Sequence, residues 1–472
     1  MGNLRESSLN LITVTAHAAT AARSFLSSSG CCANNTRLSI DFFLRSLYDA
    51  RMKPQELQSL DRRLSRFLKD LLSPMGRSER RHWARVYVQG LLLDGERKSI
   101  EPIASRIPEA DVQALRQFVG QSPWAVDDIQ HRLAKKVVDL FSQPEVWLID
   151  DTSFPKAGSQ SVGVARQYCG ALGKVANCQV AVTLHWGNGQ MSCPLGWRLY
   201  LPKEWLQDAE RAAKVKLPTG TTYKTKTELA LELIDQTVDW ELPQLPVVAD
   251  SFYGNDFGFR EALRSRQLHY VMAVEPTTVV WSTDPNVALP SPAQTGRPRR
   301  YPARESLPAA KDLLTLSQSL PASAWRGVCW RQGTRGKQRS RFALSKVWAA
   351  HGWRKQEHPE RVAEWLLVEW PQDEEKPTKY WLAELGPKRP GLQRIAKIAH
   401  SRWRIELDYR ELKEELGLDH FEGRHWLGWH HHVTLVSMAY AFLRSEQARV
   451  KKNFWLEPAS DSPENAVRVN PP

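Results

Sequence analysis

The length, composition and charge of the chain exclude several classes of protein. With 472 residues it is longer than one simple core, so we expect two or three domains, and its 42% hydrophobic and 25% charged residues exclude a disordered chain or an integral membrane protein. The 65 Lys and Arg against 52 Asp and Glu give a net charge of +13, which favours nucleic acid as the partner over an ordinary basic enzyme.

The first 37 residues are polar and rich in small side chains, and we expect them to be disordered. They lack the continuous apolar stretch of a signal peptide, and no segment reaches the ~18 apolar residues of a membrane-spanning helix. The cysteines form no CxxC pair of the zinc-binding kind, which indicates buried, reduced thiols. These features predict a cytoplasmic protein with no membrane partner.

Residues 38–145 have the pattern of a helical domain. Apolar residues recur at three- and four-residue spacing in SLDRRLSRFLKDLL and WAVDDIQHRLAKKVVDLF. Residues 76–107 add a series of Arg and Lys to a helical pattern, which fits a DNA-binding surface about as well as a solvated face. We interpret 38–145 as a helical N-terminal DNA-binding domain.

The pattern changes at residue 146. Segments rich in Val, Ile and aromatic residues predict strands: EVWLIDD, NCQVAVTLHW, GWRLYLP, LPVVADSFYG and LHYVMAV. Between them, TKTELALELIDQTV and NDFGFREALRSR have helical spacing. Hairpin-like strands followed by strand–helix alternation predict a mixed α/β sheet over residues 146–275.

Residues 276–390 interrupt this pattern. The segment holds eight of the nineteen Trp and basic clusters such as WRQGTRGKQRSRF, and it ends in two strand signals, EWLLVEW and TKYWLAEL, around an acidic turn. We interpret it as a β-containing insertion whose Trp side chains serve either core packing or stacking against unpaired bases. Helical spacing returns over 391–446, and 447–472 has the composition of a frayed tail.

Three acids follow predicted strands. Asp150 and Asp151 come directly after the apolar run Trp147, Leu148, Ile149, and Asp250 follows an apolar run of its own. Because an unpaired buried carboxylate is costly, such acids usually have a cation, a set of donors or a metal as partner. Ligands bind at the carboxyl ends of strands in open sheets, so two strands can bring these carboxylates together. Helix capping is the alternative role, although for Asp250 the next helical pattern begins several residues later.

A fourth acid lies in LQRIAKIAHSRWRIELDYRELKEELG. If this segment is one helix, Arg402, Glu406 and Lys413 lie within about 40° of one another, and Glu406 sits between two cations at the edge of the apolar stripe. The alternative is a surface ion pair of Arg402 with Glu406, worth about 0.3–0.5 kcal/mol. The same rotation predicts that the remaining acids face solvent: Glu411, Glu414 and Glu415. Converging carboxylates suit a hard divalent cation and phosphoryl transfer.

The order of these motifs resembles bacterial insertion-sequence transposases of the DDE superfamily, in the group with a Y-R-E-K signature. The resemblance covers roughly residues 70–446 and rests on YVQGLLLDGERKSIEPIA, IDDTSFPKAGSQSVGVARQYCGALGKVANCQVAV, VVADSFYGND and RWRIELDYRELKEELGLDHFEGRHWLGWHHH. Arg402, Glu406 and Lys413 match the R, E and K of the signature. The position of its Tyr is Ala399, and Tyr409 lies on the same helical stripe.

The resemblance implies an RNase H-like α/β core and a DNA transposase that cleaves the ends of its element and joins the freed 3′-hydroxyls to target DNA. It implies that Asp151, Asp250 and Glu406 hold Mg²⁺, with Mn²⁺ as a substitute ion. Arg402 and Lys413 are expected to neutralise phosphate near the scissile bond. The double-stranded DNA ends are expected to be bridged by a dimer, with further contacts from three family-like positions: Arg166, Lys174 and Arg424.

The family places its catalytic Asp directly before a Thr, which here selects Asp151. Successive strand residues face opposite sides, so we assign Asp150 a supporting role with hydrogen bonds to neighbouring amides. Three alternatives compete with a transposase. They are an RNase H-like nuclease without strand transfer, a catalytically silent DNA-binding regulator, and a glycosidase, which would not call for the basic surface.

Overall fold

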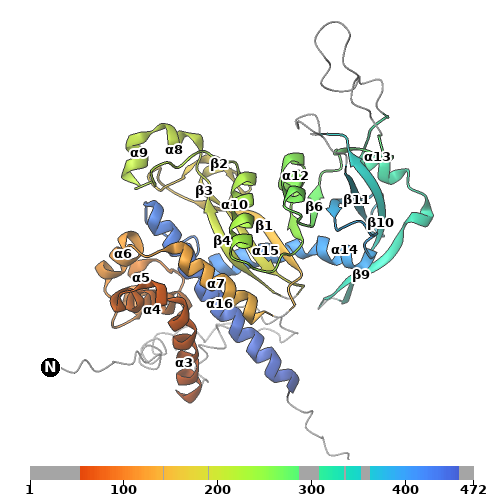
Figure 1. Ribbon diagram of the computed structural model, residues 1–472. Coiled ribbons are helices and arrows are strands. Elements are labelled where there is room, and N and C mark those ends of the chain that lie inside the picture. Colours follow the sequence, from red (N-terminus) through yellow and green to blue (C-terminus); the bar gives the residue numbers. More distant parts are fainter. Residues whose placement is uncertain are drawn as a thin grey trace, which may run out of the picture.

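The structure is a computed structural model that describes residues 54–141, 143–189, 191–285, 308–333, 336–351 and 362–456. It consists of a helical N-terminal part, a central mixed sheet with helices, a β-rich part at the far end of the sheet, and a long C-terminal helix (Figure 1). The expected disorder of residues 1–37 concerns residues outside the described ones. Among the described residues, no helix is both long enough and apolar enough to cross a bilayer.

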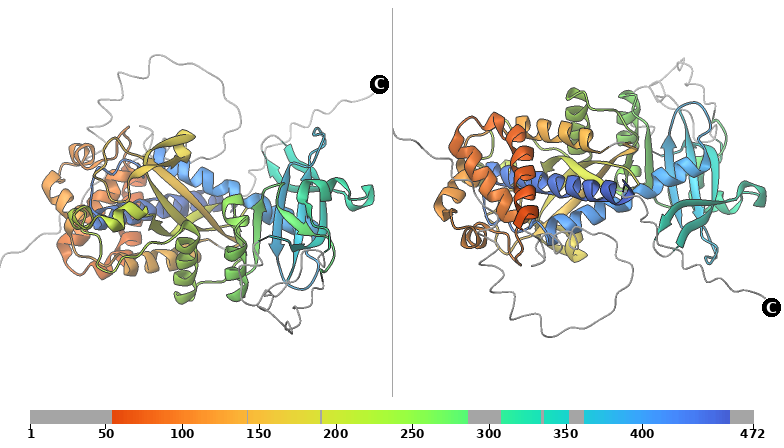
Figure 2. Two further views of the ribbon diagram at one scale, coloured as in Figure 1. Left: turned by 90° about the horizontal axis from the view of Figure 1, so that it is seen from above. Right: turned by 90° about the horizontal axis from the view of Figure 1, so that it is seen from below.

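Short helices form the N-terminal part: α3 (Pro54–Leu71), α4 (Ser78–Leu92), α5 (Ile100–Arg106), α6 (Val112–Gln121) and α7 (Val126–Leu140). They bury the apolar residues that recur at helical spacing in the sequence. They pack around α16 (Trp426–Leu456), which runs among them in both views of Figure 2. The helix α16 ends at Leu456 and therefore extends beyond residue 446, where we expected the ordered core to end.

The central strands are β1 (Val146–Pro155), β2 (Ala165–Cys169), β3 (Lys174–Gly187), β4 (Ser192–Leu199), β5 (Val247–Ala249) and β6 (Tyr270–Val274). The strands β1 to β4 form antiparallel pairs, whereas β5 pairs parallel with both β1 and β6. The connections contain α8 (Lys203–Gln207), α9 (Ala209–Lys214), α10 (Lys226–Asp239), α11 (Ser251–Gly254) and α12 (Phe257–Ser265). This arrangement confirms the predicted mixed α/β class and fits an RNase H-like core.

The β-rich part contains β7 (Val279–Trp281), β8 (Lys311–Asp312), α13 (Leu313–Gln318), β9 (Arg326–Gly333), β10 (Gly336–Ala349), β11 (Ala363–Trp370) and β12 (Lys379–Glu384). The two strand signals around the acidic turn are the antiparallel pair β11–β12. The strand β12 also pairs with β6, so these strands extend the central sheet, although they enclose an apolar cluster of their own.

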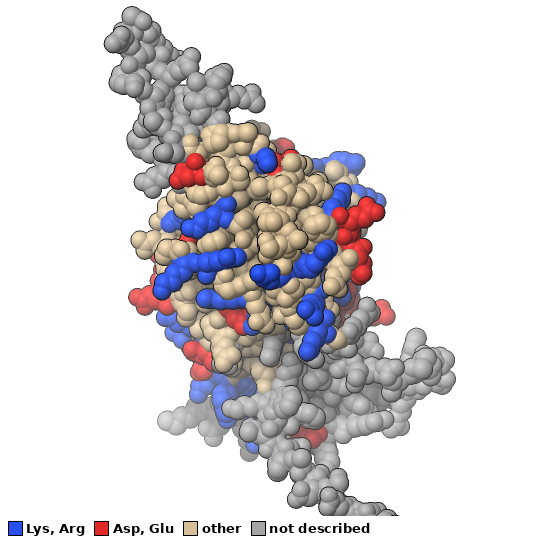
Figure 3. Space-filling view, turned by 90° about the vertical axis from the view of Figure 1, so that its right-hand side faces the viewer, with Lys and Arg blue, Asp and Glu red and all other residues tan. Residues whose placement is uncertain are grey.

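The surface of this β-rich part is basic, whereas most of its described Trp side chains have packing roles. Figure 3 shows Lys and Arg side chains across its outward face, and Lys337, Arg339 and Lys346 of β10 are exposed. Trp365 and Trp381 are buried, as is Trp281 of β7. For these three side chains, core packing is the role that the structure supports.

The apolar stripe of the C-terminal helical segment suggested one continuous helix, but the structure divides the segment. Its parts are α14 (Leu392–Ala399), a 3₁₀ turn at His400–Arg402 and α15 (Trp403–Glu414). The expectation that Glu411 faces solvent is also wrong, because α16 covers that side of α15. The Glu411 carboxylate is buried and accepts hydrogen bonds from Tyr440 and Arg444.

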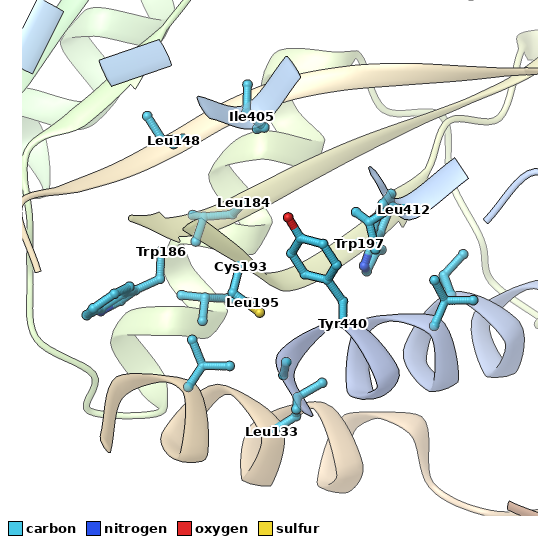
Figure 4. Close-up of a cluster of buried hydrophobic side chains, with 14 of the residues drawn as sticks. Leu133, Leu148, Leu184, Trp186, Cys193, Leu195, Trp197, Ile405, Leu412 and Tyr440 are labelled. Atoms are coloured by element: carbon cyan, nitrogen blue, oxygen red, sulfur yellow. The ribbon is translucent and has the colours of Figure 1, made fainter. Parts of the chain in front are cut away.

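A buried polar network fixes α15 between the sheet and α16. The Asp408 carboxylate contacts His185 of β3 at 2.8 Å and accepts a hydrogen bond from Tyr440 of α16 at 2.8 Å. Burial opposes ionisation of Asp408, but the His185 bond and the Arg444 charge hold its pKa at about 2. Apolar side chains of β1, β3, α15 and α7 surround this network (Figure 4). The position of α15 is therefore set from two sides.

A second buried charge cluster joins α12 to the β-rich part. The Arg260 guanidinium and the Glu364 carboxylate of β11 are 2.8 Å apart and both fully buried, and Tyr270 of β6 donates to Glu364 at 2.7 Å. Arg260 also donates to the carbonyl of Gly254, the last residue of α11. This arginine thus ties together a central helix, the end of α11 and the strand β11.

Replacement of Arg260 by Leu is expected to lower the free energy of unfolding by about 3–5 kcal/mol, because it leaves a buried carboxylate without its main cation. Urea denaturation followed by Trp fluorescence measures the loss. Arg266→Leu is the matched control, because its pair with Asp235 is 31% and 48% exposed and is worth at most about 1 kcal/mol. Equal losses in the two variants would contradict a structural role for the buried pair.

Candidate active site

Asp150 and Asp151 lie in the middle of β1 rather than at its end. The strand continues to Pro155 because its antiparallel pairing with the long strand β3 continues to the pair Pro155–Cys178. The other neighbour of β1, the parallel strand β5, stops at Ala249. Asp250 follows the end of β5 and lies beside the two acids of β1. The carboxylates of the two strands therefore meet as expected, but only β5 ends at this point, whereas β1 continues past it.

Asp250 is the N-cap of α11. Its Oδ1 accepts hydrogen bonds from the amides of Phe252 at 3.0 Å and Tyr253 at 3.4 Å. We expected capping to be the less natural role for this residue, because the four residues of α11 carry no apolar spacing that predicts a helix there; the structure shows that Asp250 does cap it. Burial raises the pKa of Asp250, the Arg402 charge opposes that rise, and the negative charge of Asp151 adds to it.

Asp150 is buried and faces Arg402. Its Oδ2 accepts a hydrogen bond from Arg402 Nη1 at 2.9 Å, and its Oδ1 accepts one from the amide of Asp151 at 2.8 Å. Burial raises the pKa of Asp150 to about 8; the Arg402 charge opposes the rise, and the charges of Asp250 and Asp151 add to it. The carboxyl group is therefore partly protonated near neutral pH.

Asp151 points to the other side of the strand, as the alternation of β1 requires. Its Oδ2 accepts a hydrogen bond from Lys226 Nζ at 2.9 Å, and both side chains are 23% exposed. Lys226 is not among the site residues predicted from the sequence. The only local signal is that it opens the helix α10, and nothing in the sequence brings that helix to Asp151.

Glu406 lies in the first turn of α15 and is 55% exposed. One of its oxygens contacts Nη2 of Arg402, whose Nη1 holds Asp150. We call this arrangement the Asp150–Arg402–Glu406 bridge. The i,i+4 ion pair that the sequence offered as an alternative is thus present, but its arginine also reaches the acids of the sheet.

The donor set matches a hard divalent cation in kind. Asp151 and Asp250 are carboxylates that interact electrostatically where β5 ends beside β1, and Mg²⁺ typically takes one or two carboxylates together with water and phosphate oxygens. Glu406 is directed to Arg402. Across the described ranges, no three His, Cys, Asp or Glu side chains are grouped closely enough to hold one ion.

Lys413 is not beside Glu406. Its Nζ donates to the carbonyl of Ser153 in β1 at 2.9 Å and lies 5.5 Å from the ring centre of Phe154. Burial lowers the pKa of Lys413, an effect that the charge of Asp419 opposes. Lys413 therefore contacts the strand that carries Asp151, two residues farther along.

The remaining predicted residues divide into exposed and buried groups. Arg166 and Lys174 are exposed on the β2–β3 hairpin. Arg424 is exposed in a loop, and its backbone carbonyl accepts a hydrogen bond at 3.0 Å from the amide of Val162, a residue just before that hairpin. Tyr409, in contrast, is buried and hydrogen-bonded to Thr183, and burial and the charge of Asp150 raise its pKa. Tyr409 thus packs behind Asp150, and Ala399 is buried as well.

Asp150→Asn is expected to flatten the pH dependence of stability. Because the folded-state pKa of Asp150 lies above the ordinary Asp value, the folded protein retains a proton between about pH 4 and 8 that the unfolded chain has lost. The wild-type free energy of unfolding therefore falls as pH rises through this window, by at most about 1.4 kcal/mol per pH unit from this group. Urea unfolding at a series of pH values measures the difference; parallel curves for both proteins would show that Asp150 ionises normally.

Comparisons with known proteins agree with the resemblance. The family described as DDE superfamily endonuclease matches residues 70–337, a range that includes Asp151 and Asp250. A probable transposase for insertion sequence element IS701 from Microchaete diplosiphon is 33% identical over 187 residues, which cover 39% of this chain and 46% of that protein. The match thus spans less than half of the relative's length. Because the family match covers more than half of the chain, this protein belongs to the DDE superfamily endonucleases.

Proposed function

We propose that the protein is a DNA transposase that cleaves the ends of its insertion sequence and joins the 3′-hydroxyl ends to target DNA by divalent-metal-dependent phosphoryl transfer. The observation that carries the proposal is the meeting of Asp151 in β1 with Asp250 at the end of β5, beside Arg402, in a member of the DDE endonucleases. The relative named as a probable transposase supports the strand-transfer part.

In this proposal Asp151 and Asp250 hold Mg²⁺, or Mn²⁺ in its place, and Glu406 completes the set. When bound, the ion supplies activation of the attacking oxygen and stabilisation of the leaving oxygen. The chain contributes the placement of its carboxylates: the α11 cap orients Asp250, and Arg402 holds Glu406 near the acids of the sheet. Arg402 also supplies positive charge beside the scissile phosphate.

In the proposed mechanism Lys413 has a positioning task in addition to the neutralisation of phosphate that the resemblance implies. Its ammonium group donates to the Ser153 carbonyl, so it fixes the strand β1 just beyond Asp151. Its positive charge also contributes to neutralising the phosphate, as the resemblance implies.

The proposed partner is double-stranded DNA, with two protomers bridging the two ends of the element. Exposed Arg166, Lys174 and Arg424 provide cations around the β2–β3 hairpin, and the basic face of the β-rich part adds more (Figure 3). The proposed organisation is a DNA-binding domain at 38–145, a core at 146–275 and 391–446, an insertion at 276–390, and a tail at 447–472 whose first ten residues continue the helix α16. The proposed location is the bacterial cytoplasm, at the nucleoid when DNA is bound.

Asp151→Asn, Asp250→Asn and Glu406→Gln are each expected to lower cleavage of a labelled element end in Mg²⁺ by a hundredfold or more, since each loses several kcal/mol of charge stabilisation (about tenfold per 1.4 kcal/mol). Binding of the end, followed by gel shift, should survive. Glu414→Gln, an exposed acid of the same helix α15, is the matched control and should cleave normally. Asp150→Ala should lose activity only in part.

Three results of such assays bear on the proposal. Cleavage without joining of the 3′-hydroxyl end to a target plasmid would assign the protein as a nuclease instead. Full activity of Asp151→Asn together with an inactive, folded Asp150→Asn would exchange the roles of the two acids. Binding with no cleavage by the wild type would favour the silent regulator.

Gln substitutions of Arg166, Lys174 and Arg424 are expected to weaken end binding and make it less dependent on salt. Each lost phosphate contact should reduce the slope of log affinity against log salt by about one. Binding is measured by fluorescence anisotropy over a range of KCl concentrations. Lys376→Gln is the control, because that exposed lysine lies in the acidic turn between β11 and β12. Unchanged slopes for all three variants would remove these residues from the DNA interface.

A further inference from the structure

Lys226 has no role in the proposed chemistry, yet it contacts the residue assigned as the first metal ligand. Its Nζ lies 2.9 Å from Oδ2 of Asp151. It also lies 5.3 Å from the ring centre of Phe252, which is 52% exposed and follows Asp250 by two residues. The ammonium group thus stands between the strand that carries Asp151 and the short helix that Asp250 caps.

The local sequence fixes the backbone of Lys226 and leaves its side chain movable. Lys226 is the first residue of α10. A capping box holds the N-terminus of this helix: the Thr225 amide donates to the Glu228 carboxylate at 2.7 Å, and the Glu228 amide donates to Thr225 Oγ1 at 3.2 Å. A cation at a helix N-terminus is unfavourable to the helix dipole. The partner that compensates Lys226 is Asp151, on a different element.

The contact between Lys226 and Asp151 contributes to the balance of charge around the site. Asp150, Asp151, Asp250 and Glu406 lie around a group of positive charge that includes Arg402 and Lys226. Arg402 contacts Asp150 and Glu406, which leaves Lys226 as the cation in contact with Asp151. A divalent cation on Asp151 would stand close to this ammonium and repel it.

We infer that Lys226 is the internal counter-ion of Asp151 in the metal-free protein and is displaced when a divalent cation binds. The inference rests on the proposed function, in which Asp151 is a metal ligand. Lysine suits this exchange because it is a point charge on a flexible four-carbon stem, without the rigid geometry of arginine. Its partial exposure lets the stem turn away from Asp151 without breaking the capping box. The released ammonium then lies at the mouth of the site, where a DNA phosphate is a suitable partner.

The decisive variant is Lys226→Met, which keeps the length of the stem and removes the competing charge. Full-length protein without DNA is titrated calorimetrically with MnCl₂. Lys226→Met is expected to bind Mn²⁺ about fivefold more tightly than the wild type, the factor that corresponds to about 1 kcal/mol for a partly exposed pair. Lys226→Arg, which keeps a cation, should not show this gain.

Lys224→Met is the matched control. That lysine lies two residues earlier and contacts Glu232 instead of Asp151, so its loss should leave the affinity for Mn²⁺ unchanged. The melting temperature provides a second readout, measured first on the metal-free protein and then with added Mn²⁺. Metal-free Lys226→Met should melt below the wild type, because Asp151 has lost its counter-ion, and Mn²⁺ should raise its melting temperature by more than it raises that of the wild type.

Equal or weaker Mn²⁺ binding by Lys226→Met would overturn the inference, because it would show that Lys226 orients the ligand or is a bystander. Asp151→Asn separates this failure from that of the proposed function. If Asp151→Asn weakens Mn²⁺ binding while Lys226→Met does not tighten it, only the counter-ion role fails. If Asp151→Asn binds Mn²⁺ like the wild type, the metal assignment fails and the inference fails with it.

Discussion

The geometry of the site depends on the Asp150–Arg402–Glu406 bridge. One guanidinium group holds a buried carboxyl of the sheet and an exposed carboxylate of α15, and it also acts on Asp250. Without that charge, three acids gathered where β5 ends would repel one another in a partly buried position, which is costly. The bridge therefore makes the cluster of acids tolerable in the absence of metal.

The bridge in turn depends on where the 3₁₀ turn and α15 lie. Asp408 of α15 is bonded to His185 of β3 and Tyr440 of α16, and Glu411 is bonded to Arg444. These contacts fix the helix within about one and a half turns beyond Glu406. The long helix α16 is itself enclosed by the N-terminal helices, so the geometry of the acids rests on packing far from them.

Features that depend on the local sequence, such as strand and helix patterns, are predicted well, whereas features that depend on contacts with distant segments are predicted poorly. The strand and helix patterns gave the mixed α/β class, and the family motifs pointed to Asp151, Asp250 and Glu406. The strand end expected at Asp150 does not exist because β3 continues to pair, which no property of β1 reveals. The solvated face expected for Glu411 is covered by α16, whose position no helical rotation shows. Lys226 was missed for the same reason, since its partner lies 75 residues away.

The β-rich part is joined to the acids by more than the shared sheet. Arg260 contacts Glu364 of β11 and the carbonyl of Gly254, and Gly254 ends the short helix that Asp250 caps. A displacement of β11 by a bound partner would therefore be transmitted to the backbone of α11 through a buried ion pair, which cannot yield without exposing or unpairing a charge. Because α11 has only four residues, it has little internal freedom to absorb such a displacement. The orientation of the Asp250 carboxylate is thus physically linked to the β-rich part, whose basic face is one of the surfaces proposed to bind DNA.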